Sequence, residues 1–383
     1  MEGAEPEAKL GGDVHGHKRP DPEKTVGEAF DGGDAIAKRQ REGDDDHTMA
    51  MDEDAEEEKV YTAADAFEIH RKEWVDFYGR GDASAFYNST ELVPMLYTDG
   101  PVLPMHLEPT DTMEVFFIKV THISSSLQWP LEVYGDVAVR DSADHKRIYL
   151  FRRNRDNCQT LISPQDSLLE LTGPSRAIIV LDAPIFEIDL KVKAKESSSS
   201  SQDDMLLCLD YFGYNPRSYW GETSYAITEV VSGQNCAMEF RFAHLKRSLE
   251  ATITARIVSG PRKLTARLTA HTTSIGGEII GGEEVVLLDS GGREVAVAGE
   301  EGTELVLRRR VVVVEERGEL VLVIKAAQLD GGGGGGDESS SCSGTSDVIE
   351  KHRRLSPRHA LRSITYAVIG PTKLEIMVAW SLL

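Results

Sequence analysis

Four aspartates lie in stretches of the chain that could supply a calcium site. Calcium is bound by several carboxylate and carbonyl oxygens, and loops of β-sandwich proteins can collect such groups. The four are Asp136, Asp141, Asp144 and Asp210. Basic side chains stand directly beside Asp141 and Asp144, so a solvated turn with local ion pairs explains the same pattern more simply. We therefore predict no metal site.

A short basic segment is the second candidate for chemistry. Arg152, Arg153 and Arg155 follow a predicted strand, with Lys146 and Arg147 upstream. Such a cluster could hold an anion or an RNA phosphate. Nearby carboxylates dilute the charge, and no stacking pair of aromatic residues accompanies it. A strand with an aromatic core face and a charged edge is the simpler interpretation, and a weak anion or RNA patch at the three arginines stays open.

Motifs for hydrolysis, phosphate binding and redox chemistry are missing from the sequence. The eleven histidines are scattered without an HExxH spacing, and there is no GxSxG elbow and no P-loop. A GxGxxG pattern occurs only within the linker-like run Gly331–Gly336. The four cysteines, which form no CxxC pair, are expected to be reduced apolar residues. The sequence therefore predicts no catalytic residue and no cofactor, and it leans away from an enzyme.

Alternation of apolar and polar residues dominates the chain from residue 112 onwards. In 131–139, Leu131, Val133, Val137 and Val139 share one face. The continuous apolar run 178–181 predicts a strand buried on both faces. The other predicted strands are 114–121, 146–152, 186–193, 251–257, 264–270, 304–315, 319–325 and 374–380. Many short strands separated by turn signals predict an all-β fold with an antiparallel β-sandwich region.

One helix is expected before these strands, from Ala63 to Gly79. Phe67, His70 and Trp74 recur at spacings of three and four residues, as on one face of a helix. Gly79 would end the helix. We expect this amphipathic helix to pack on the main domain, with a partner-binding helix as the alternative.

Two pairs of segments have similar sequences within each pair. The two members of a pair are separated by nearly the same number of residues in both cases. The pairs are 186–194 with 319–327, and 113–124 with 249–260. They indicate two similar halves, 101–235 and 236–383. Chance similarity between amphipathic strands would produce the same matches, so both interpretations stay open.

Charge is distributed unevenly. Residues 1–60 contain 19 acidic and 8 basic residues, a net charge of −11 out of −22 for the whole chain. A segment of this composition cannot bury enough apolar surface to order itself, so we predict a disordered acidic tail. A helix and linker at 61–100 and a β-rich domain at 101–383 follow it. The acidic balance argues against a nucleic-acid partner, because phosphate contacts need clustered lysine and arginine.

The sequence gives no signal for a membrane or for secretion. No run of 18 apolar residues is present, so no membrane-spanning segment is expected. The first residues lack the basic start and apolar core of a signal peptide. We therefore expect an intracellular protein, in the cytoplasm or nucleus.

Several longer strings resemble a known family. The strings are WPLEVYGDVAVRD, KRIYLFRRNRDNCQ, LLELTGPSRAIIVLD and FEIDLKVKAK. They resemble an uncharacterised domain family of cereal grasses, and the resemblance covers Val102–Leu383, more specifically in its first third than after Glu222. Similar domains also follow the N-glycosidase module of jasmonate-induced ribosome-inactivating proteins. The resemblance implies a setting in plant stress or defence.

The glycosidase activity itself cannot be transferred to this chain. That activity needs a helical Glu-Ala-x-x-Arg motif, and the nearest string here, 238–242, alternates like a strand. We therefore expect a non-enzymatic binding or scaffold module with an unknown protein partner. The alternatives are an enzyme acting on a nucleoside or glycan, and an RNA-binding or translation-associated domain.

Overall fold

The computed structural model describes residues 62–100, 106–194, 203–218, 221–329 and 347–383. Antiparallel strands make up most of these residues, together with one α-helix and several short 3-10 helices. This confirms the predicted all-β class and its single N-terminal helix. The acidic segment 1–60 lies outside the described residues.

The first part of the β region is built from two facing sheets. Its strands are β1 (Thr110–Ile123), β2 (Leu131–Arg140), β3 (Ile148–Arg153), β4 (Gln159–Leu161), β5 (Ile178–Ile179), β6 (Ile185–Val192), β7 (Met205–Gly213) and β8 (Tyr225–Ser232). One sheet has the order β3-β2-β6-β7, with β4 paired to β2. Its apolar face packs on β1, β8 and the start of β9, in a core that includes Val133, Ile188 and Phe240.

A single long strand, β9 (Cys236–Ser259), joins this part to the rest of the chain. Its first residues pair with β1 and β8, and its later residues pair with β14 and β18. Arg247 lies between these two sections and has a φ of 40°, a left-handed conformation that breaks the regular strand. One strand therefore contributes to both hydrophobic cores.

The second part repeats the layout of two facing sheets. Its strands are β10 (Leu264–Thr272), β11 (Val285–Asp289), β12 (Val297–Ala298), β13 (Glu304–Leu305), β14 (Val311–Glu315), β15 (Leu320–Gln328), β16 (Ile349–Leu355), β17 (Arg362–Ile369) and β18 (Thr372–Ser381). One sheet has the order β11-β10-β15-β16. Its core with β9, β14 and β18 includes Ile253, Leu322 and Trp380.

The two parts have the same strand order. The sheet β3-β2-β6-β7 corresponds to β11-β10-β15-β16, and the path β8-β9-β1-β5 corresponds to β17-β18-β9-β14. All these pairings are antiparallel. Corresponding strands can therefore be compared directly, and β8 is the counterpart of β17. Descent of both halves from one duplicated ancestor stays a prediction.

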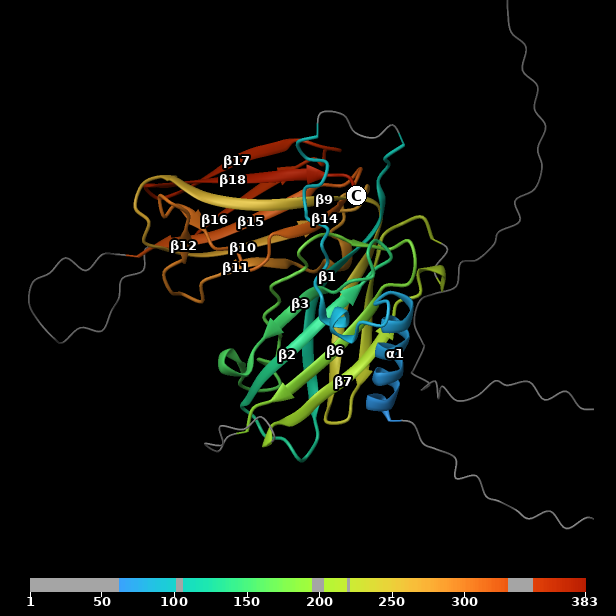
Figure 1. The fold of residues 1–383 in the computed structure, drawn as a ribbon. Helices are drawn as coiled ribbons and strands as arrows, with labels where there is room; N and C mark the ends of the chain where they lie inside the picture. Colours follow the sequence, from blue (N-terminus) through green and yellow to red (C-terminus); the bar gives the residue numbers. More distant parts are fainter. Residues whose placement is uncertain (1–61, 101–105, 195–202, 219–220, 330–346) are drawn as a thin grey trace, which may run out of the picture. The chain divides into compact units, whose positions relative to one another are not determined.

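Helix α1 (Ala63–Phe77) packs against β7, as Figure 1 shows. A capping box between Thr62 and Asp65 fixes its start. The helix buries Phe67, His70 and Trp74, so the expected packing on the main domain is confirmed. The 3-10 helices are η1 (Ala83–Tyr87), η2 (Arg155–Asn157), η4 (Pro216–Ser218) and η5 (Ile280–Gly282). Among the described residues, no helix has the length and apolar character that a bilayer crossing would require.

Two of the strand predictions are wrong in detail. The run 178–181 forms only the two-residue strand β5 at a sheet edge, and Leu181 is 67% exposed. The expected single strand 304–315 is divided into β13 and β14. The intervening Arg309 is buried, and its guanidinium binds the buried carboxylate of Glu114 at 3.0 Å.

Candidate functional site

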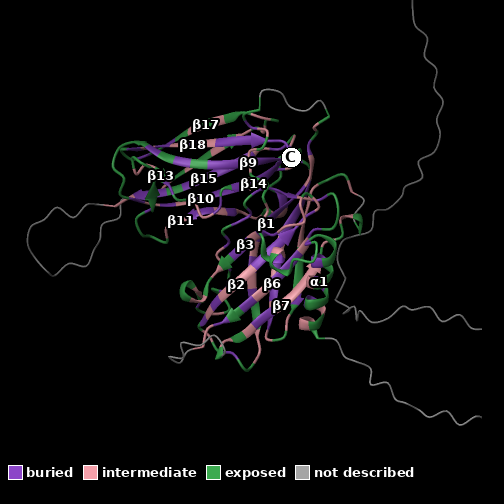
Figure 2. Cartoon of the chain, in the orientation of Figure 1, coloured by how far each residue is buried: buried purple, intermediate pink, exposed green. Residues whose placement is uncertain are grey.

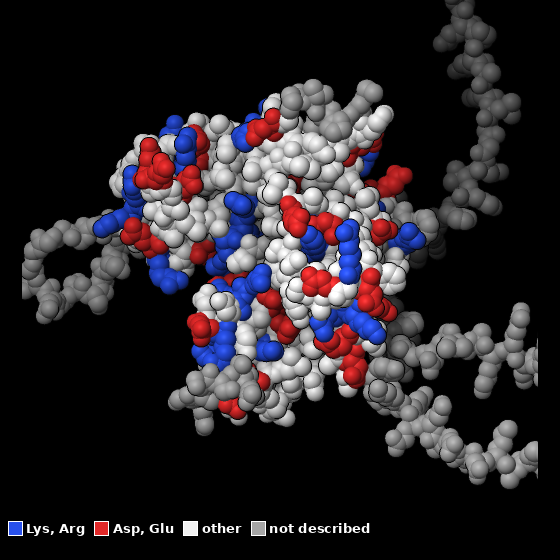
Figure 3. Space-filling view, in the orientation of Figure 1, with Lys and Arg blue, Asp and Glu red and all other residues white. Residues whose placement is uncertain are grey.

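The predicted basic patch lies at the end of β3 and in the segment that follows it. Each of its three guanidinium groups already contacts a carboxylate. The pairs are Arg152 with Asp136, Arg153 with Glu170 and Arg155 with Asp204, at 3.5, 2.5 and 2.6 Å. Figure 3 shows the same mixture of basic and acidic side chains over β2 and β3. The local positive charge is therefore largely compensated, which weakens the case for an anion or RNA site.

The four aspartates of the calcium hypothesis bind protein groups instead. Asp141 accepts two hydrogen bonds from Arg176, at 2.6 and 2.8 Å, and Asp144 lies 3.3 Å from the same guanidinium. Asp136 lies on β2 and Asp210 on β7. Within the described ranges, no group of three histidine, cysteine, aspartate or glutamate residues is arranged to hold a metal ion.

Glu187 on β6 is the centre of a buried charged cluster that the alternation pattern had placed on the solvent face. Its carboxylate accepts hydrogen bonds from Arg140 Nε at 2.6 Å, Arg147 Nε at 2.6 Å and His70 Nε2 at 2.7 Å. Glu187 is only 2% exposed, because α1 and η1 cover this face of the sheet. The alternation of β6 could not reveal a second covering layer.

The same cluster fixes α1 in place. The Arg140 guanidinium lies 4.4 Å from the ring centroids of both Trp74 and Phe86. Burial alone would raise the pKa of the Glu187 carboxyl. The hydrogen bond from His70 and the charges of the two arginines outweigh burial and lower that pKa to about 2. The carboxylate therefore stays charged at neutral pH and acts as a structural anchor.

A second polar cluster surrounds His244 on β9, where the two halves of the β region meet. His244 Nε2 lies 2.9 Å from Asp111 Oδ2, and Lys246 Nζ lies 2.9 Å from the same oxygen. On the other side of the ring, the Tyr214 hydroxyl lies 2.8 Å from His244 Nδ1. The Tyr225 hydroxyl contacts the Tyr214 hydroxyl in turn. A carboxylate, an imidazole and a hydroxyl thus follow one another as in nucleophilic triads.

The electrostatics of this cluster oppose activation of the hydroxyl. Burial, together with the hydrogen bond to Tyr225, raises the pKa of Tyr214, so its hydroxyl keeps its proton. Burial would raise the pKa of Asp111, but hydrogen bonds from His244 and Lys246 lower it to about 2. The cluster combines a permanently charged carboxylate with a protonated phenol, an arrangement suited to holding three segments together.

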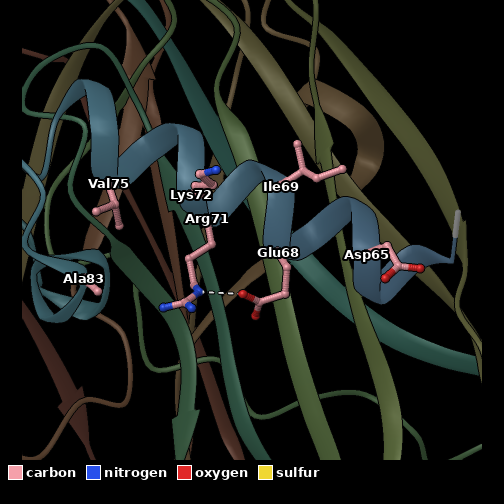
Figure 4. Close-up of a pocket in the computed structure, with 7 residues that line it drawn as sticks. All are labelled: Asp65, Glu68, Ile69, Arg71, Lys72, Val75 and Ala83. Atoms are coloured by element: carbon pink, nitrogen blue, oxygen red, sulfur yellow. Dashed lines mark hydrogen bonds and ion pairs between the residues drawn. The ribbon is translucent and has the colours of Figure 1, made fainter.

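Two open hollows lie on the described surface. One, of about 470 Å³, lies beside α1 (Figure 4) and is lined by Asp65, Glu68, Ile69, Arg71, Lys72, Val75 and Ala83. Its labelled side chains leave the helix in different directions, and Arg71 is paired with Glu68 at 2.9 Å. The other, of about 420 Å³, lies at the end of β9 and includes Arg256 and Arg262. Its lining also includes Glu301, and Arg256 is already paired with Glu375 at 2.7 Å.

The clearest unpartnered feature is the outer face of β17. Ile364, Tyr366 and Val368 point away from the core and are 54%, 41% and 53% exposed. The alternate residues of the strand point inward, and Ala367 and Ile369 belong to the core. Figure 2 shows β17 largely exposed or intermediate beside the more deeply buried β18. β17 pairs with β18 and with no other described strand, so it is an edge strand.

The exposed row continues onto β18. Ile364 lies opposite Met377, Tyr366 opposite Glu375, and Val368 opposite Lys373. Glu375 accepts a hydrogen bond from Arg256 of β9 at 2.7 Å, and this bond lowers the pKa of Glu375. A hydrogen bond between Tyr366 and Glu375 raises the pKa of Tyr366. Lys373 Nζ lies 4.1 Å from the centroid of the Tyr366 ring. We call the residues Ile364, Tyr366, Val368, Met377 and Lys373 the β17 face.

The counterpart strand of the first half differs at the matching positions. The residues of β8 that face away from the first core are Ala226, Thr228 and Val230. Ala226 packs against the core of the second half, and only Val230 is a large exposed apolar side chain. The sequence pattern missed β17 because its apolar residues occupy both faces and hide the period of two. Its signal is the run Ile364 to Ile369, in which five of six side chains are apolar or aromatic.

Comparison with protein families gives the chain its classification. The model for "Domain of unknown function (DUF6598)" matches residues 112–378. The chain belongs to this family. The match spans both halves of the β region and ends within β18. No curated protein matches the sequence.

Solved structures add little to this classification. Human GIVD cytosolic phospholipase A2 has a TM-score of 0.22 and 9% sequence identity, over 73% of this chain and 33% of that one. Its complex with methyl gamma-linolenyl fluorophosphonate has a TM-score of 0.22 and 10% identity, over 71% and 32%. The chain thus spans about a third of that protein's length, and a likeness this weak carries no argument about fold or activity.

Proposed function

We propose that this DUF6598 protein is a non-enzymatic binding or scaffold module that holds a protein partner on its β17 face. The observation that supports this is the exposed row Ile364, Tyr366 and Val368 on an edge strand. Edge strands are ordinarily protected by charges, proline or a covering element. Contiguous apolar surface on a soluble domain typically marks an interaction site. The resemblance to cereal-grass proteins makes an intracellular role in stress or defence part of the proposal.

The test compares affinity capture from stressed leaf extract by three forms of the full chain. Ile364→Asp combined with Val368→Asp places charge in the exposed row. Val230→Asp makes the same change on the counterpart strand β8, where the exposed fraction is 57%. We expect the unchanged chain and Val230→Asp to recover a common partner that the double variant loses. Recovery of the same proteins by all three forms would contradict the proposal.

A second candidate is an enzyme acting on a nucleoside or glycan, and the Asp111–His244–Tyr214 sequence of contacts favours it. The raised pKa of Tyr214 opposes its activation as a nucleophile, so a binding role has better support than an enzymatic one. Turnover of a nucleoside or oligosaccharide that is lost in His244→Ala would reverse this ranking. The RNA alternative predicts salt-sensitive RNA binding that is lost when Arg152 and Arg153 are both changed to Ala.

A further inference from the structure

The surface around the β17 face is basic, although the chain as a whole is acidic. Residues 349–383 contain six lysines and arginines and two glutamates, a net charge of +4, against −22 for the whole chain. These residues comprise β16, β17, β18 and their connections. A local excess of positive charge in so acidic a protein indicates that this surface favours a negatively charged partner.

Several of these cations make no ion pair with a described residue. They are Lys351, Arg353, Arg358 and Lys373. By contrast, Arg362 is paired with Asp99, and Arg354 with Glu319. Glu375 lies near Lys373 and partly offsets its charge, but it binds Arg256 directly, so the segment keeps a net positive charge around β17. A carboxylate supplied by a partner would find cations there that form no ion pair with a described carboxylate.

Two of the unpaired cations lie directly at the exposed row. Arg353 of β16 donates from Nε to the carbonyl oxygen of Tyr366 and from Nη1 to that of His352, both at 2.7 Å, so its guanidinium lies at the edge of β17. Lys373 covers the Tyr366 ring from the neighbouring strand. Positive charge and apolar side chains thus occupy one continuous surface. A partner that binds here must therefore present both negative charge and apolar side chains.

We infer that the partner presents an acidic peptide segment with apolar side chains between its carboxylates. This inference rests on the proposed function and specifies its partner. The apolar row takes the partner's apolar side chains, and Arg353 and Lys373 take its carboxylates. Exposed charges are screened beyond about 8 Å at physiological salt. The net charge of the whole chain therefore does not repel such a segment at contact, where the local cations act.

A nucleic acid fits this surface less well. Single-stranded RNA binds where several aromatic side chains stack on successive bases along a basic groove. The β17 face offers one exposed ring, Tyr366, and two aliphatic side chains, Ile364 and Val368, that have no complement on a phosphate backbone. We therefore assign the surface to a peptide, and RNA becomes an outcome of the test.

The experiment measures binding of short labelled peptides to the full chain by fluorescence anisotropy, at low and physiological salt. Three capped peptides of equal length alternate valine with glutamate, glutamine or lysine. We expect the glutamate peptide to bind about tenfold more tightly than the glutamine peptide, in a salt-dependent manner, and the lysine peptide not to bind. Lys373→Glu should weaken the glutamate peptide about fivefold. Lys72→Glu, the same change on α1, should leave its affinity unchanged.

The possible failures are distinguishable. Equal binding of the glutamine and glutamate peptides would overturn the acidic partner and leave the β17 face as a binding surface. If no peptide binds and capture is unaffected by Ile364→Asp with Val368→Asp, the proposed function fails as well. Tight binding of an oligouridine probe that is lost in Lys373→Glu would replace the peptide with a nucleic acid.

Discussion

Replacing Glu187 with glutamine should release α1 from the sheet. The substitution keeps the shape of the side chain and removes the charge that Arg140 and Arg147 share. Both guanidinium groups are nearly completely buried, with 3% and 2% of their side chains exposed. Removing one partner from a buried ion pair leaves an uncompensated charge, at a cost of about 3–5 kcal/mol.

The lowered pKa of Glu187 expresses the same stabilisation as a dependence on pH. The folded-state pKa is about 2, against 4.5 for the ordinary carboxyl. At 1.36 kcal/mol per pKa unit, this difference corresponds to about 3 kcal/mol of stability. Because the pKa is lowered on folding, the contribution is fully present above pH 4.5 and is lost as the pH falls towards 2.

Hydrogen exchange of the α1 amides is the appropriate assay, because it reports local opening as well as global unfolding. A loss of about 3 kcal/mol corresponds to exchange faster by about two orders of magnitude at neutral pH. Glu375→Gln is the matched control, since its partner Arg256 is 56% exposed and such pairs contribute about 0–1 kcal/mol. Equal α1 exchange in Glu187→Gln and Glu375→Gln would refute the anchoring role.

Three further predictions concern the cores and the junction. Burial raises the pKa of Glu114 to about 7, although Arg309 opposes the shift. Because the folded state holds this proton more tightly, the free energy of unfolding should decrease as the pH rises from 4.5 to 7. Urea titrations at several pH values should show a smaller decrease for Glu114→Gln. His244→Ala should destabilise the chain by about 1–3 kcal/mol in urea, because it leaves buried hydrogen-bonding groups without partners. Cys208 and Cys236 are buried, and the hydrogen bond with Cys236 together with burial raises the pKa of Cys208, so both thiols should resist an alkylating reagent in the folded chain and react once urea unfolds it, as mass spectrometry of the labelled protein would show.

The sequence was sufficient for the elements whose environment is simple. The alternation in 131–139 and 186–193 placed β2 and β6 within a residue or two, because one face of each strand packs on the core. The helical spacing of Phe67, His70 and Trp74 located α1 for the same reason. In each case one period of apolar residues corresponds to one buried face.

Prediction failed where a third element or a distant segment changed the environment. Glu187 belongs to an alternating strand and is buried only because α1 and η1 cover it, and Arg309 is buried against Glu114, nearly two hundred residues away. At Arg152 and Arg153 the sequence already favoured a charged strand edge over a site, but it could not name Asp136 and Glu170 as the partners. Pairing over such distances leaves no local trace.

The β17 face gains meaning from the correspondence between the halves. β8 and β17 occupy the same place in their sheets, and both need inward apolar residues for their cores. That shared requirement does not explain the opposite faces: on β8 Ala226 packs against the second core, with Thr228 and Val230 exposed, whereas on β17 Ile364, Tyr366 and Val368 are all exposed. The common fold does not require an exposed apolar row on β17. Such a row is the feature expected of a surface that binds a partner.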